Sequence, residues 1–431
     1  MLAALYDVAV IAAAPAPLAD AALAELSSRH DGQRFWLFAL GKAAPGLASG
    51  GVSALRRSLH TIAGGVVVSS EAVAAPFSTV RSAQGGHPLP DASSFAAARL
   101  IGDAVSQVRG DDAAIVLVSG GTTSLVAAPV GAVKEQDLEH LFIQLMDAGL
   151  DIGAMNAVRK RFLRWGAGRL AVALAPARTH VLLLSDVPGD APSDIGSGPC
   201  APDEWTARDL TAMLSDARLL DALAPSVREY LAAVTRGVAA ETPTAGHPAF
   251  AHVSTRIIGS NALALDAVLT RARDFGLPAQ RGTFALAGEA AACGEQIAHA
   301  LLDRVTRGES GCLAWGGETT VQLEHTSMAE GTGGRCQELA LAAARTLAAG
   351  GDAARRITLL AAGTDGRDGP TDAAGAFADA TLWQRIRDRD VNPDEALAQH
   401  RSHAALDAAG ALLRRGATGT NVMDLVIGLV E

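Results

Sequence analysis

The sequence predicts an α/β protein of two domains, the first and larger of which is built around a mostly parallel β-sheet. Near-continuous apolar runs alternate along the chain with helical patterns, and strands of that kind are typical of parallel sheets covered on both faces. The length of 431 residues allows two or three domains with sizeable cores. Residues 236–250 are rich in Thr, Pro and Gly and lack periodicity, so they are the best linker candidate.

The individual elements follow from the same periodicity. A helix is expected near Pro17, and helical patterns at 94–109 and 134–149 separate the first group of strands. That first group is expected at 35–40, 64–70, 113–119 and 180–186. Beyond the linker, strands are expected at 254–260, 282–288, 311–317, 356–363 and 425–430. The expected domains are residues 1–240 and 253–431, joined by a linker at 241–252.

Composition narrows the class of protein. The formal net charge of −10 argues against a general nucleic-acid or anionic-membrane surface, because such surfaces depend on basic patches. Four cysteines lie far apart without Cys-x-x-Cys spacing, which favours a reduced cytoplasmic protein without a zinc site or disulfides. The apolar start carries Asp7 and no basic segment, so it is interpreted as folded protein. No membrane span is expected, because no run of 18 charge-free apolar residues occurs.

Polar glycine turns follow several of the predicted strands. Lys42 comes directly after one strand, residues 119–123 follow another, and Glu318 follows a third. Glycine turns let backbone N–H groups approach a phosphate, and a following helix would add its positive end. The sequence therefore predicts an anion site, although the Walker A and G-x-G-x-x-G spacings are both missing.

Three aspartates, Asp186, Asp190 and Asp194, lie in a segment rich in Pro and Gly at the end of the predicted strand 180–186. Turn geometry alone would account for this composition, because Asp, Gly and Pro suit turns. Carboxylates at the end of a parallel strand can instead hold a metal or accept a proton. The loop by itself leaves both interpretations open.

Basic residues gather in two places despite the acidic balance. The run at 159–169 holds five of them, and a solvated helix face is its simplest interpretation. Arg335 lies in the first turn of a predicted helix, where a cation is disfavoured. Its position therefore calls for a compensating anion, and a bound phosphate or carboxylate would supply one.

Nine segments in collinear order resemble the glycerate 2-kinase family. They are GKAA at 41–44, GGHPLPD at 85–91, SGGTTSL at 119–125, NAVRKRF at 156–162, SDVPGDAPSDIGSGP at 185–199, GGETT at 316–320, GGRCQELAL at 333–341, AAGTDGRDGPTDAAGA at 361–376 and GATGTNVMDL at 416–425. Members of this family are ATP-dependent kinases whose C-terminal part is the MOFRL domain, and some carry an older hydroxypyruvate reductase label.

The resemblance implies that ATP phosphorylates the 2-hydroxyl of D-glycerate, giving 2-phosphoglycerate and ADP, with Mg²⁺ present. It also implies a Rossmann-like N-terminal domain, a C-terminal α/β domain with the MOFRL region at about 310–425, and an active site in the cleft between them. The implied catalytic residues are Lys42, Asp190 and Arg335. The implied substrate- and nucleotide-binding residues are Ser119, Gly120, Gly121, Thr122, Thr123, Arg159 and Lys160, and the implied metal ligands are Asp186 and Glu318.

Two positions depart from the family's pattern. Members commonly show a third Gly and then Ser-Ala in the loop that here reads Ser119-Gly120-Gly121-Thr122-Thr123, and they show Asn where this chain has Cys336. The second change puts any hydrogen bond from position 336 in doubt, because a thiol substitutes poorly for an amide. The remaining residues of these motifs are expected to be structural: Asp194, the turn and cap residues Asp365, Asp368 and Asp372, and the turn residue His87.

Two other classes of function are compatible with the sequence. One is an NAD(P)H-dependent reductase of hydroxypyruvate or tartronate semialdehyde, against which the missing dinucleotide fingerprint counts. The other is a non-catalytic sensor of sugar acids or nucleotides that uses the same cleft. The expected partners are the small molecules D-glycerate and ATP, with no nucleic acid and no membrane, and a homodimer is left open.

Overall fold

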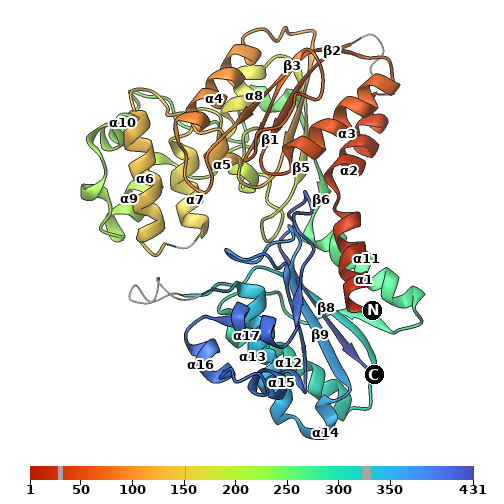
Figure 1. Cartoon of the computed structure of the whole chain (residues 1–431). Helices are drawn as coiled ribbons and strands as arrows, with labels where there is room; N and C mark the ends of the chain where they lie inside the picture. Colours follow the sequence, from red (N-terminus) through yellow and green to blue (C-terminus); the bar gives the residue numbers. More distant parts are fainter. Residues whose placement is uncertain (28–32, 151, 323–331) are drawn as a thin grey trace. The chain divides into compact units, whose positions relative to one another are not determined.

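The computed structural model describes residues 1–27, 33–150, 152–322 and 332–431. They form two compact units (Figure 1). Residues 15–258 make up the N-terminal unit, while residues 1–14 and 259–431 make up the C-terminal unit. The sequence-based boundaries assign residues 1–14 to the first domain, whereas the contacts of the structure group them with the second.

The N-terminal unit is built on a six-stranded sheet with the order β3-β2-β1-β4-β5-β6, and pairing from β3 to β5 is parallel. The strands are β1 (Arg34–Leu40), β2 (Thr61–Ser69), β3 (Val80–Gln84), β4 (Ala113–Val118), β5 (Arg178–Leu184) and β6 (Val253–Gly259). Every residue of β4 is buried, which explains its unbroken apolar sequence. The strand order reverses between β1 and β4, and such a reversal is where ligands bind in doubly wound sheets.

Helices pack on this sheet and also form a separate cluster beside it (Figure 1). The cluster of α6, α7, α9 and α10 has its own apolar core, which includes Leu138, Phe142, Leu210 and Leu231. The helices of the unit are α2 (Pro15–Ser27), α3 (Ala44–Arg57), α4 (Ala92–Val105), α5 (Thr122–Leu125), α6 (Glu135–Asp147), α7 (Ile152–Arg161), α8 (Arg169–Leu174), α9 (Ala207–Asp216) and α10 (Pro225–Thr235), with short 3₁₀ turns η1 (Ile195–Ser197), η2 (Leu220–Ala222) and η3 (Pro248–His252).

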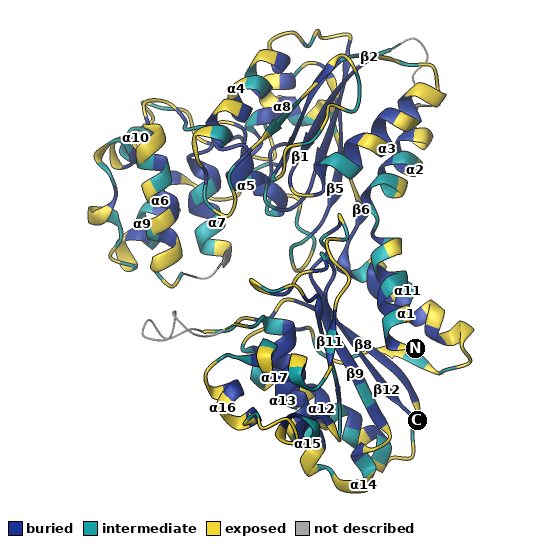
Figure 2. Ribbon diagram, in the orientation of Figure 1, coloured by how far each residue is buried: buried dark blue, intermediate teal, exposed yellow. Residues whose placement is uncertain are grey.

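The C-terminal unit contains a mixed sheet with the order β11-β10-β9-β12-β8-β7, in which β7 and β8 are parallel and the other pairs are antiparallel. Its strands are β7 (Ala279–Arg281), β8 (Gly311–Gly317), β9 (Ile357–Gly363), β10 (Gly375–Asp379), β11 (Leu412–Leu413) and β12 (Asp424–Val430). Figure 2 shows that its central strands are buried. Both faces of this sheet are covered, which accounts for the apolar sequence of β12.

Helices α1 (Leu2–Ala12) and α11 (Asn261–Asp274) cover one face of the second sheet, and α12 (Ala290–Thr306) and α13 (Arg335–Ala349) cover the other (Figure 1). The remaining helices are α14 (Gly351–Ala354), α15 (Leu382–Arg387), α16 (Pro393–Ala398) and α17 (Ser402–Ala408). The long α13 is buried along most of its length, including Leu339, Leu341 and Leu347. It therefore forms the centre of the second core.

The predicted α/β class with a mostly parallel first sheet is confirmed. The strand expected at 282–288 is wrong: this segment makes only an isolated bridge from Leu286 to Gly317, and β7 ends at Arg281. Gly288 has a φ of +71°, and Leu286 N–H donates to Gly316 in an otherwise irregular segment. This apolar run between glycines is therefore a loop. It runs beside the end of β8 in space but does not pair with it as a regular strand.

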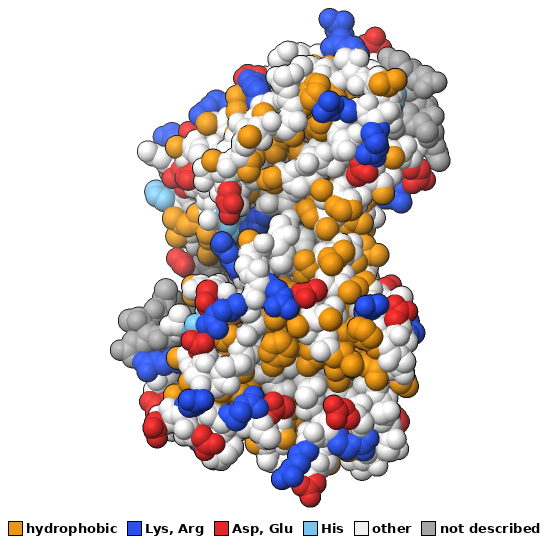
Figure 3. All heavy atoms as spheres, turned by 45° about the vertical axis from the view of Figure 1, so that its right-hand side comes forward, with side chains coloured by type: hydrophobic (Ala, Val, Ile, Leu, Met, Phe, Trp, Pro, Cys, Tyr) orange, Lys and Arg blue, Asp and Glu red, His pale blue; other side chains and the backbone are white. Residues whose placement is uncertain are grey.

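Among the described residues, 2–26 form the one helical stretch that is long and apolar enough to cross a membrane, with a mean hydropathy of 1.7. Its first part, α1, buries Leu5, Tyr6 and Ala9 in the C-terminal unit, and the Tyr6 hydroxyl donates to the Gly363 carbonyl at 2.8 Å. Figure 3 shows hydrophobic side chains at the surface. On α1 itself, Ile11 is exposed. The apolar composition of α1 is therefore explained by its packing in the core of the C-terminal unit.

Candidate active site

Two loops of the N-terminal unit meet where the strand order reverses. The Lys42 N–H, just after β1, donates to the Gly120 carbonyl at 2.9 Å, and the Ala43 N–H donates to Ser119 Oγ at 3.0 Å. Ser119 N–H in turn donates to the Leu40 carbonyl at 2.9 Å. The segments that carry Lys42 and the predicted phosphate loop are thus joined by backbone hydrogen bonds.

Glycine is required in this loop because side chains crowd it. A Cβ added at Gly120 would lie 1.7 Å from Asp186 Oδ2, and one at Gly121 would lie 3.1 Å from Lys42 Cγ and 3.2 Å from His87 Cδ2. Gly121 also has a φ of +83°, which a side chain would strain. Asp186, Lys42 and His87 therefore surround the glycine pair, and the structure brings these residues together.

The backbone N–H groups of residues 120–123 make no hydrogen bond within the described parts of the chain. The nearby hydroxyls are engaged, since Thr122 Oγ1 donates to the Ser119 carbonyl at 2.8 Å and Thr123 Oγ1 lies 2.7 Å from Ser197 Oγ. The helix that follows, α5, is only four residues long, so it adds little dipole. Free N–H groups, rather than a helix end or hydroxyls, are what this loop offers an anion.

Charge and burial distinguish the three side chains around the loop. Burial raises the pKa of the Asp186 carboxyl, and the nearby Lys42 ammonium partly opposes that rise. Burial together with the charge of Lys42 lowers the pKa of His87 to about 4, so its imidazole is neutral at physiological pH. Lys42 itself is exposed and has no carboxylate within ion-pair distance among the described residues. Lys42 therefore acts on Asp186 through charge alone and forms no direct ion pair within the described residues.

The loop after β5 explains the remaining aspartates. The Asp190 N–H donates to the Val187 carbonyl at 3.1 Å across a turn in which Gly189 has a φ of +81°, and Asp190 itself has a φ of +55°. Its side chain makes no hydrogen bond or ion pair within the described ranges. Asp194 instead lies 3.7 Å from Lys160 Nζ and accepts a hydrogen bond from Ser193, which agrees with a structural role.

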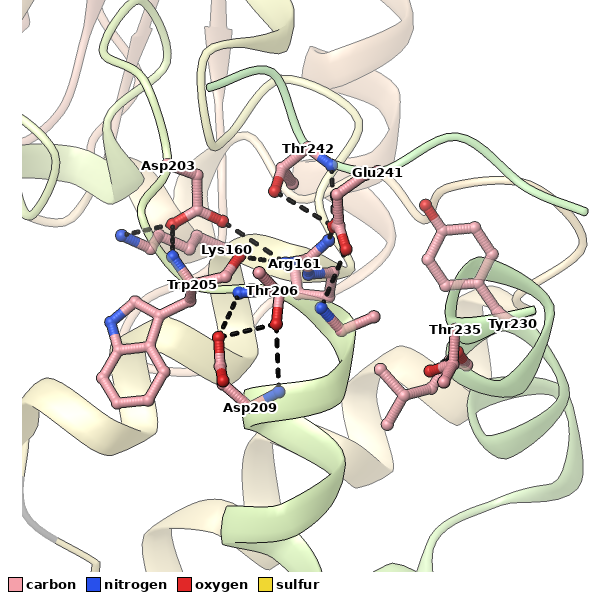
Figure 4. A network of polar contacts seen from close by, with 12 residues as sticks. Lys160, Arg161, Asp203, Trp205, Thr206, Asp209, Tyr230, Thr235, Glu241 and Thr242 are labelled. Atoms are coloured by element: carbon pink, nitrogen blue, oxygen red, sulfur yellow. Dashed lines mark hydrogen bonds and ion pairs between the residues drawn. The ribbon is translucent and has the colours of Figure 1, made fainter. Parts of the chain in front are cut away.

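Lys160 and Arg161 belong to a buried polar network (Figure 4). Lys160 Nζ lies 3.1 Å from Asp203, and the fully buried Arg161 lies 3.7 Å from the same carboxylate and also pairs with Glu241. Burial lowers the pKa of Arg161 to about 10, against the opposing charge of Asp203. The structure thus directs Lys160 to Asp203, a partner that the sequence analysis missed.

Arg159 is the basic residue of α7 that forms no ion pair with a described residue, unlike Lys160 and Arg161. Arg169 donates to the carbonyls of Arg161 and Leu163 at 3.1 and 3.0 Å, so it caps the C-terminal end of α7. The Arg159 guanidinium lies 4.9 Å from the centre of the Phe142 ring, and burial lowers its pKa. It has no ion-pair partner in the described part of the chain.

The second candidate centre lies at one edge of the sheet in the C-terminal unit. Because β12 runs antiparallel between β8 and β9, its first residue, Asp424, lies beside their last residues, Gly317 and Gly363. Arg335 Nε and an Nη donate to the two Asp424 carboxylate oxygens at 2.5 and 3.0 Å. Glu318 Oε1, just after β8, lies 2.7 Å from the other Nη of Arg335.

Asp424 and Glu318 of the same chain therefore supply the negative charge that the position of Arg335 requires. Burial would lower the pKa of Arg335, but the hydrogen bond and charge of Asp424, assisted by Glu318, outweigh it and raise that pKa. The Asp424 side chain is only 3% exposed, whereas that of Arg335 is 36% exposed. The buried Asp424 carboxylate thus fixes one side of the Arg335 guanidinium, and another side of the guanidinium stays accessible to solvent.

Asp368 caps the helix that carries Arg335. Its carboxylate accepts the N–H groups of Cys336 and Gln337 at 3.1 and 2.8 Å, in agreement with the expected cap role. Burial, followed by the charge of Asp424, raises its pKa to about 6. Burial also raises the pKa of the Cys336 thiol well above its usual range. Position 336 thus uses its backbone N–H, which the change from Asn to Cys does not remove.

The other two aspartates of that motif also have structural partners. Asp365 Oδ1 accepts the Arg367 N–H at 3.0 Å, which closes a turn. Asp372 lies 2.7 Å from Arg414 and 2.9 Å from His403, which lowers its pKa to about 2. Asp365 thus has the turn role expected from the sequence. Asp372 instead forms side-chain ion pairs, so its role is structural but is neither a turn nor a cap.

Taken together, the fold and these two centres define a two-unit α/β enzyme. Family models match the chain in two parts: a domain of unknown function, DUF4147, over residues 1–232 and the MOFRL family over residues 311–424. The chain is 33% identical to the D-glycerate 2-kinase of Thermotoga maritima over 95% of this chain and 94% of that protein. It is 37% identical to an Agrobacterium vitis protein named "Putative hydroxypyruvate reductase", over 84% of this chain and 80% of that one.

A solved structure agrees with these matches. The crystal structure of glycerate kinase from Thermotoga maritima superposes with a TM-score of 0.85 at 32% identity, covering 99% of this chain and 98% of that one. The chain belongs to the glycerate kinase family, a family of enzymes.

Gly120→Ala is predicted to destabilise the N-terminal unit, because its Cβ would overlap the Asp186 carboxylate. A loss of about 1–3 kcal/mol in the free energy of unfolding is expected from overpacking. Asp186→Ala in the same chain is expected to recover most of that loss. Urea unfolding of the single and double variants measures this coupling.

Gly246→Ala is the matched control, because a Cβ at Gly246 would meet no atom within 4 Å. Strictly additive effects of the substitutions at Gly120 and Asp186 would contradict the predicted contact.

Asp368 is predicted to make stability fall as pH rises from about 4 to 7. Its pKa is raised to about 6 in the folded protein, so the folded state binds the proton more tightly than the unfolded state does. The stabilising contribution is complete below the unfolded pKa and is lost as pH rises through the folded pKa. Relative to Asp368→Asn, the wild-type protein is expected to lose roughly 3 kcal/mol over this range.

Thermal unfolding of both proteins across this pH range measures the difference. Asp372→Asn is the control, because the pKa of Asp372 is lowered to about 2 and it titrates outside this range. A constant difference between wild type and Asp368→Asn from pH 4 to 7 would overturn the assignment.

Proposed function

We propose that this protein transfers the γ-phosphoryl group of ATP to the 2-hydroxyl of D-glycerate and releases 2-phosphoglycerate and ADP. The observation that carries the proposal is the loop at 119–123, whose free N–H groups lie beside the unpaired Lys42 at the reversal of strand order. The name of the Thermotoga relative supports glycerate as the acceptor. Phosphoryl transfer depends on positioning and charge neutralisation, and these loops supply both.

The nucleotide phosphates are assigned to the N-terminal unit. The N–H groups of Gly120, Gly121, Thr122 and Thr123 donate to phosphate oxygens, while Lys42 neutralises charge on the transferring group. Arg159, with its charge free, is a further phosphate contact. Lys160 is reassigned as a structural support of α7, because Asp203 already engages it at 3.1 Å.

A divalent cation fits Asp186 better than Glu318. No group of three or more His, Cys, Asp or Glu side chains in the described residues could hold a metal by itself. Mg²⁺ beside a nucleotide is usually bound through one or two carboxylates and the phosphates, and the Asp186 carboxylate faces the phosphate loop. When bound, Mg²⁺ would neutralise phosphate charge. Glu318 is reassigned as a support of Arg335, its partner at 2.7 Å.

The acceptor chemistry is assigned to Asp190 and Arg335. Asp190 accepts the proton of the 2-hydroxyl, since its carboxylate has no described partner that would compete. The solvent-facing side of Arg335 binds the glycerate carboxylate or the transferring phosphoryl group through its planar fork. The two centres lie in different units of the chain. The protein is proposed to act on these small molecules in the cytoplasm.

A reductase is the competing function, because one relative carries that name. The turn after β1 reads Gly41-Lys42-Ala43-Ala44 and lacks the three glycines that let a dinucleotide pyrophosphate approach the backbone. The lysine in this turn is also better suited to a terminal phosphate than to a nicotinamide. Kinase chemistry is therefore the proposal.

With D-glycerate, ATP and Mg²⁺, the product is expected to feed enolase directly. The reason is that enolase consumes 2-phosphoglycerate, whereas the 3-phosphate would first need phosphoglycerate mutase. A coupled assay with and without mutase measures this. Turnover that requires mutase would show that the 3-hydroxyl is the acceptor and would overturn the proposed product.

Two controls accompany this assay. Excess EDTA is expected to abolish turnover, and full activity in EDTA would remove the metal role of Asp186. NADH with hydroxypyruvate is expected to give no oxidation, and sustained oxidation would favour the reductase.

Arg335→Lys is predicted to lower kcat/KM for glycerate about 30-fold, which corresponds to roughly 2 kcal/mol of transition-state stabilisation. An ammonium group cannot reproduce the fork that faces Asp424 on one side and substrate on the other. Steady-state kinetics and thermal unfolding of the same preparation measure the effect.

Arg345→Lys on the same helix is the matched control, because Arg345 pairs with Glu295 at the surface. Near wild-type kcat/KM in Arg335→Lys would refute the role. A loss that merely follows a lowered melting temperature would make Arg335 structural.

A further inference from the structure

The chain passes between the two units twice, at residues 14–15 and 258–259. Next to each passage, a residue of the C-terminal unit is hydrogen-bonded to the same short segment, residues 420–424. Thr420 Oγ1 donates to the Ala13 carbonyl at 2.7 Å. Asn261 Nδ2 donates to the carbonyls of Val422 and Asp424 at 2.8 and 3.0 Å.

Asn261 is fitted closely into this position. It is 7% exposed, and a Cβ at Gly316 would lie only 1.7 Å from its Oδ1. The start of α11 does not use this amide, because Ser260 Oγ caps the helix by accepting the Leu263 N–H. The Asn261 amide therefore donates to the last turn before β12, at Val422, and to the first residue of β12, Asp424.

That segment contains a strained residue. Met423 has a φ of +68°, which is uncommon for a residue other than glycine and persists only where the surroundings fix it. The Asn261 amide bonds to the carbonyls on either side of Met423. From the other side, Thr364 Oγ1 donates to the Met423 carbonyl at 2.7 Å and accepts the Val422 N–H at 2.8 Å.

The hydrogen bonds from Asn261 and Thr364 around Met423 fix the direction of the next residue, Asp424. Its backbone carbonyl is held by Asn261, and its carboxylate holds both nitrogens of the Arg335 fork. A change in the orientation of the Asp424 carboxylate would therefore displace the Arg335 guanidinium that is bonded to it. A displacement of about 1 Å at a reacting group can lower a rate by about 100-fold.

We propose that Asn261 is a positioning residue for phosphoryl transfer: it fixes the strained turn at Met423 and thereby the Asp424 carboxylate that orients Arg335. This proposal rests on the proposed role of Arg335. Because Asn261 lies shortly after the passage at 258–259, it also ties that connection, through Asp424, to Arg335.

Asn261→Ala tests the proposal. The variant is expected to lose at least tenfold in kcat/KM for glycerate, and hydrogen exchange is expected to become faster in the peptide spanning 418–426. Asn392→Ala is the matched control, because Asn392 also makes two hydrogen bonds in the same unit, to the Asp394 and Glu395 N–H groups. It is expected to stay within twofold of wild type.

Asn261→Asp keeps the shape beside Gly316 and removes both donated hydrogen bonds, so it should give the same loss if the alanine variant folds poorly. A folded Asn261 variant with activity within twofold of wild type would overturn the proposal. So would faster exchange spread evenly over the whole C-terminal unit, because that would indicate general destabilisation.

The double variant with Arg335→Ala separates this proposal from the proposed function. If Asn261 acts through Arg335, adding Asn261→Ala to Arg335→Ala should cause no further loss of kcat/KM. A full further tenfold loss would overturn the route through Arg335. If Arg335→Ala alone keeps wild-type activity, the proposed function of Arg335 fails, whatever the exchange data show at 418–426.

Discussion

The bidentate ion pair between Arg335 and Asp424 is the interaction on which the C-terminal unit depends. A cation in the first turn of a helix is unfavourable by itself, and so is a carboxylate that is 3% exposed. Each group offsets the cost of the other, and the pair joins α13 to the edge of the sheet where β12 begins. Asp368 and Glu318 complete this arrangement, since one caps the helix and the other pairs with the guanidinium.

The N-terminal unit handles charge in the opposite way. Its cation, Lys42, has no described carboxylate partner, and its anion-binding groups are backbone N–H groups exposed by a glycine pair. The parallel order of β1 and β4 brings these loops together without any side-chain pair. One unit thus offers an uncompensated site for phosphate, while the other offers an arginine oriented in advance for a planar anion. Asn261 adds the link that holds this orientation next to the point where the chain changes unit.

Local signals allowed the sequence to predict the long buried strands, the glycine loops and the need of Arg335 for a counter-ion, but the short strands β3, β7, β10 and β11 were missed. The identity of that counter-ion could not be predicted, because Asp424 lies 89 residues away and only strand pairing brings it beside β8 and β9. Separation along the chain also prevented the prediction of Asn261 as a partner of Asp424, 163 residues away, and of Asp203 as the partner of Lys160. The wrong strand at 282–288 shows the limit of apolar runs, since Gly282 and Gly288 border a loop. The resemblance of nine segments identified the family, which the relatives confirm.

The main proposal is that Lys42 and the N–H groups at 120–123 bind the phosphates of ATP, and that Arg335 binds glycerate or the terminal phosphate. A crystal structure with a non-hydrolysable ATP analogue, Mg²⁺ and D-glycerate tests it most directly. The account predicts phosphate oxygens within hydrogen-bond distance of the N–H groups at 120–123 and of Lys42, with the Arg335 fork on the glycerate or the terminal phosphate while Asp424 stays paired behind it. A complex in which no phosphate oxygen contacts Lys42 or the N–H groups at 120–123, or in which Arg335 leaves Asp424 to point away from both ligands, would contradict it.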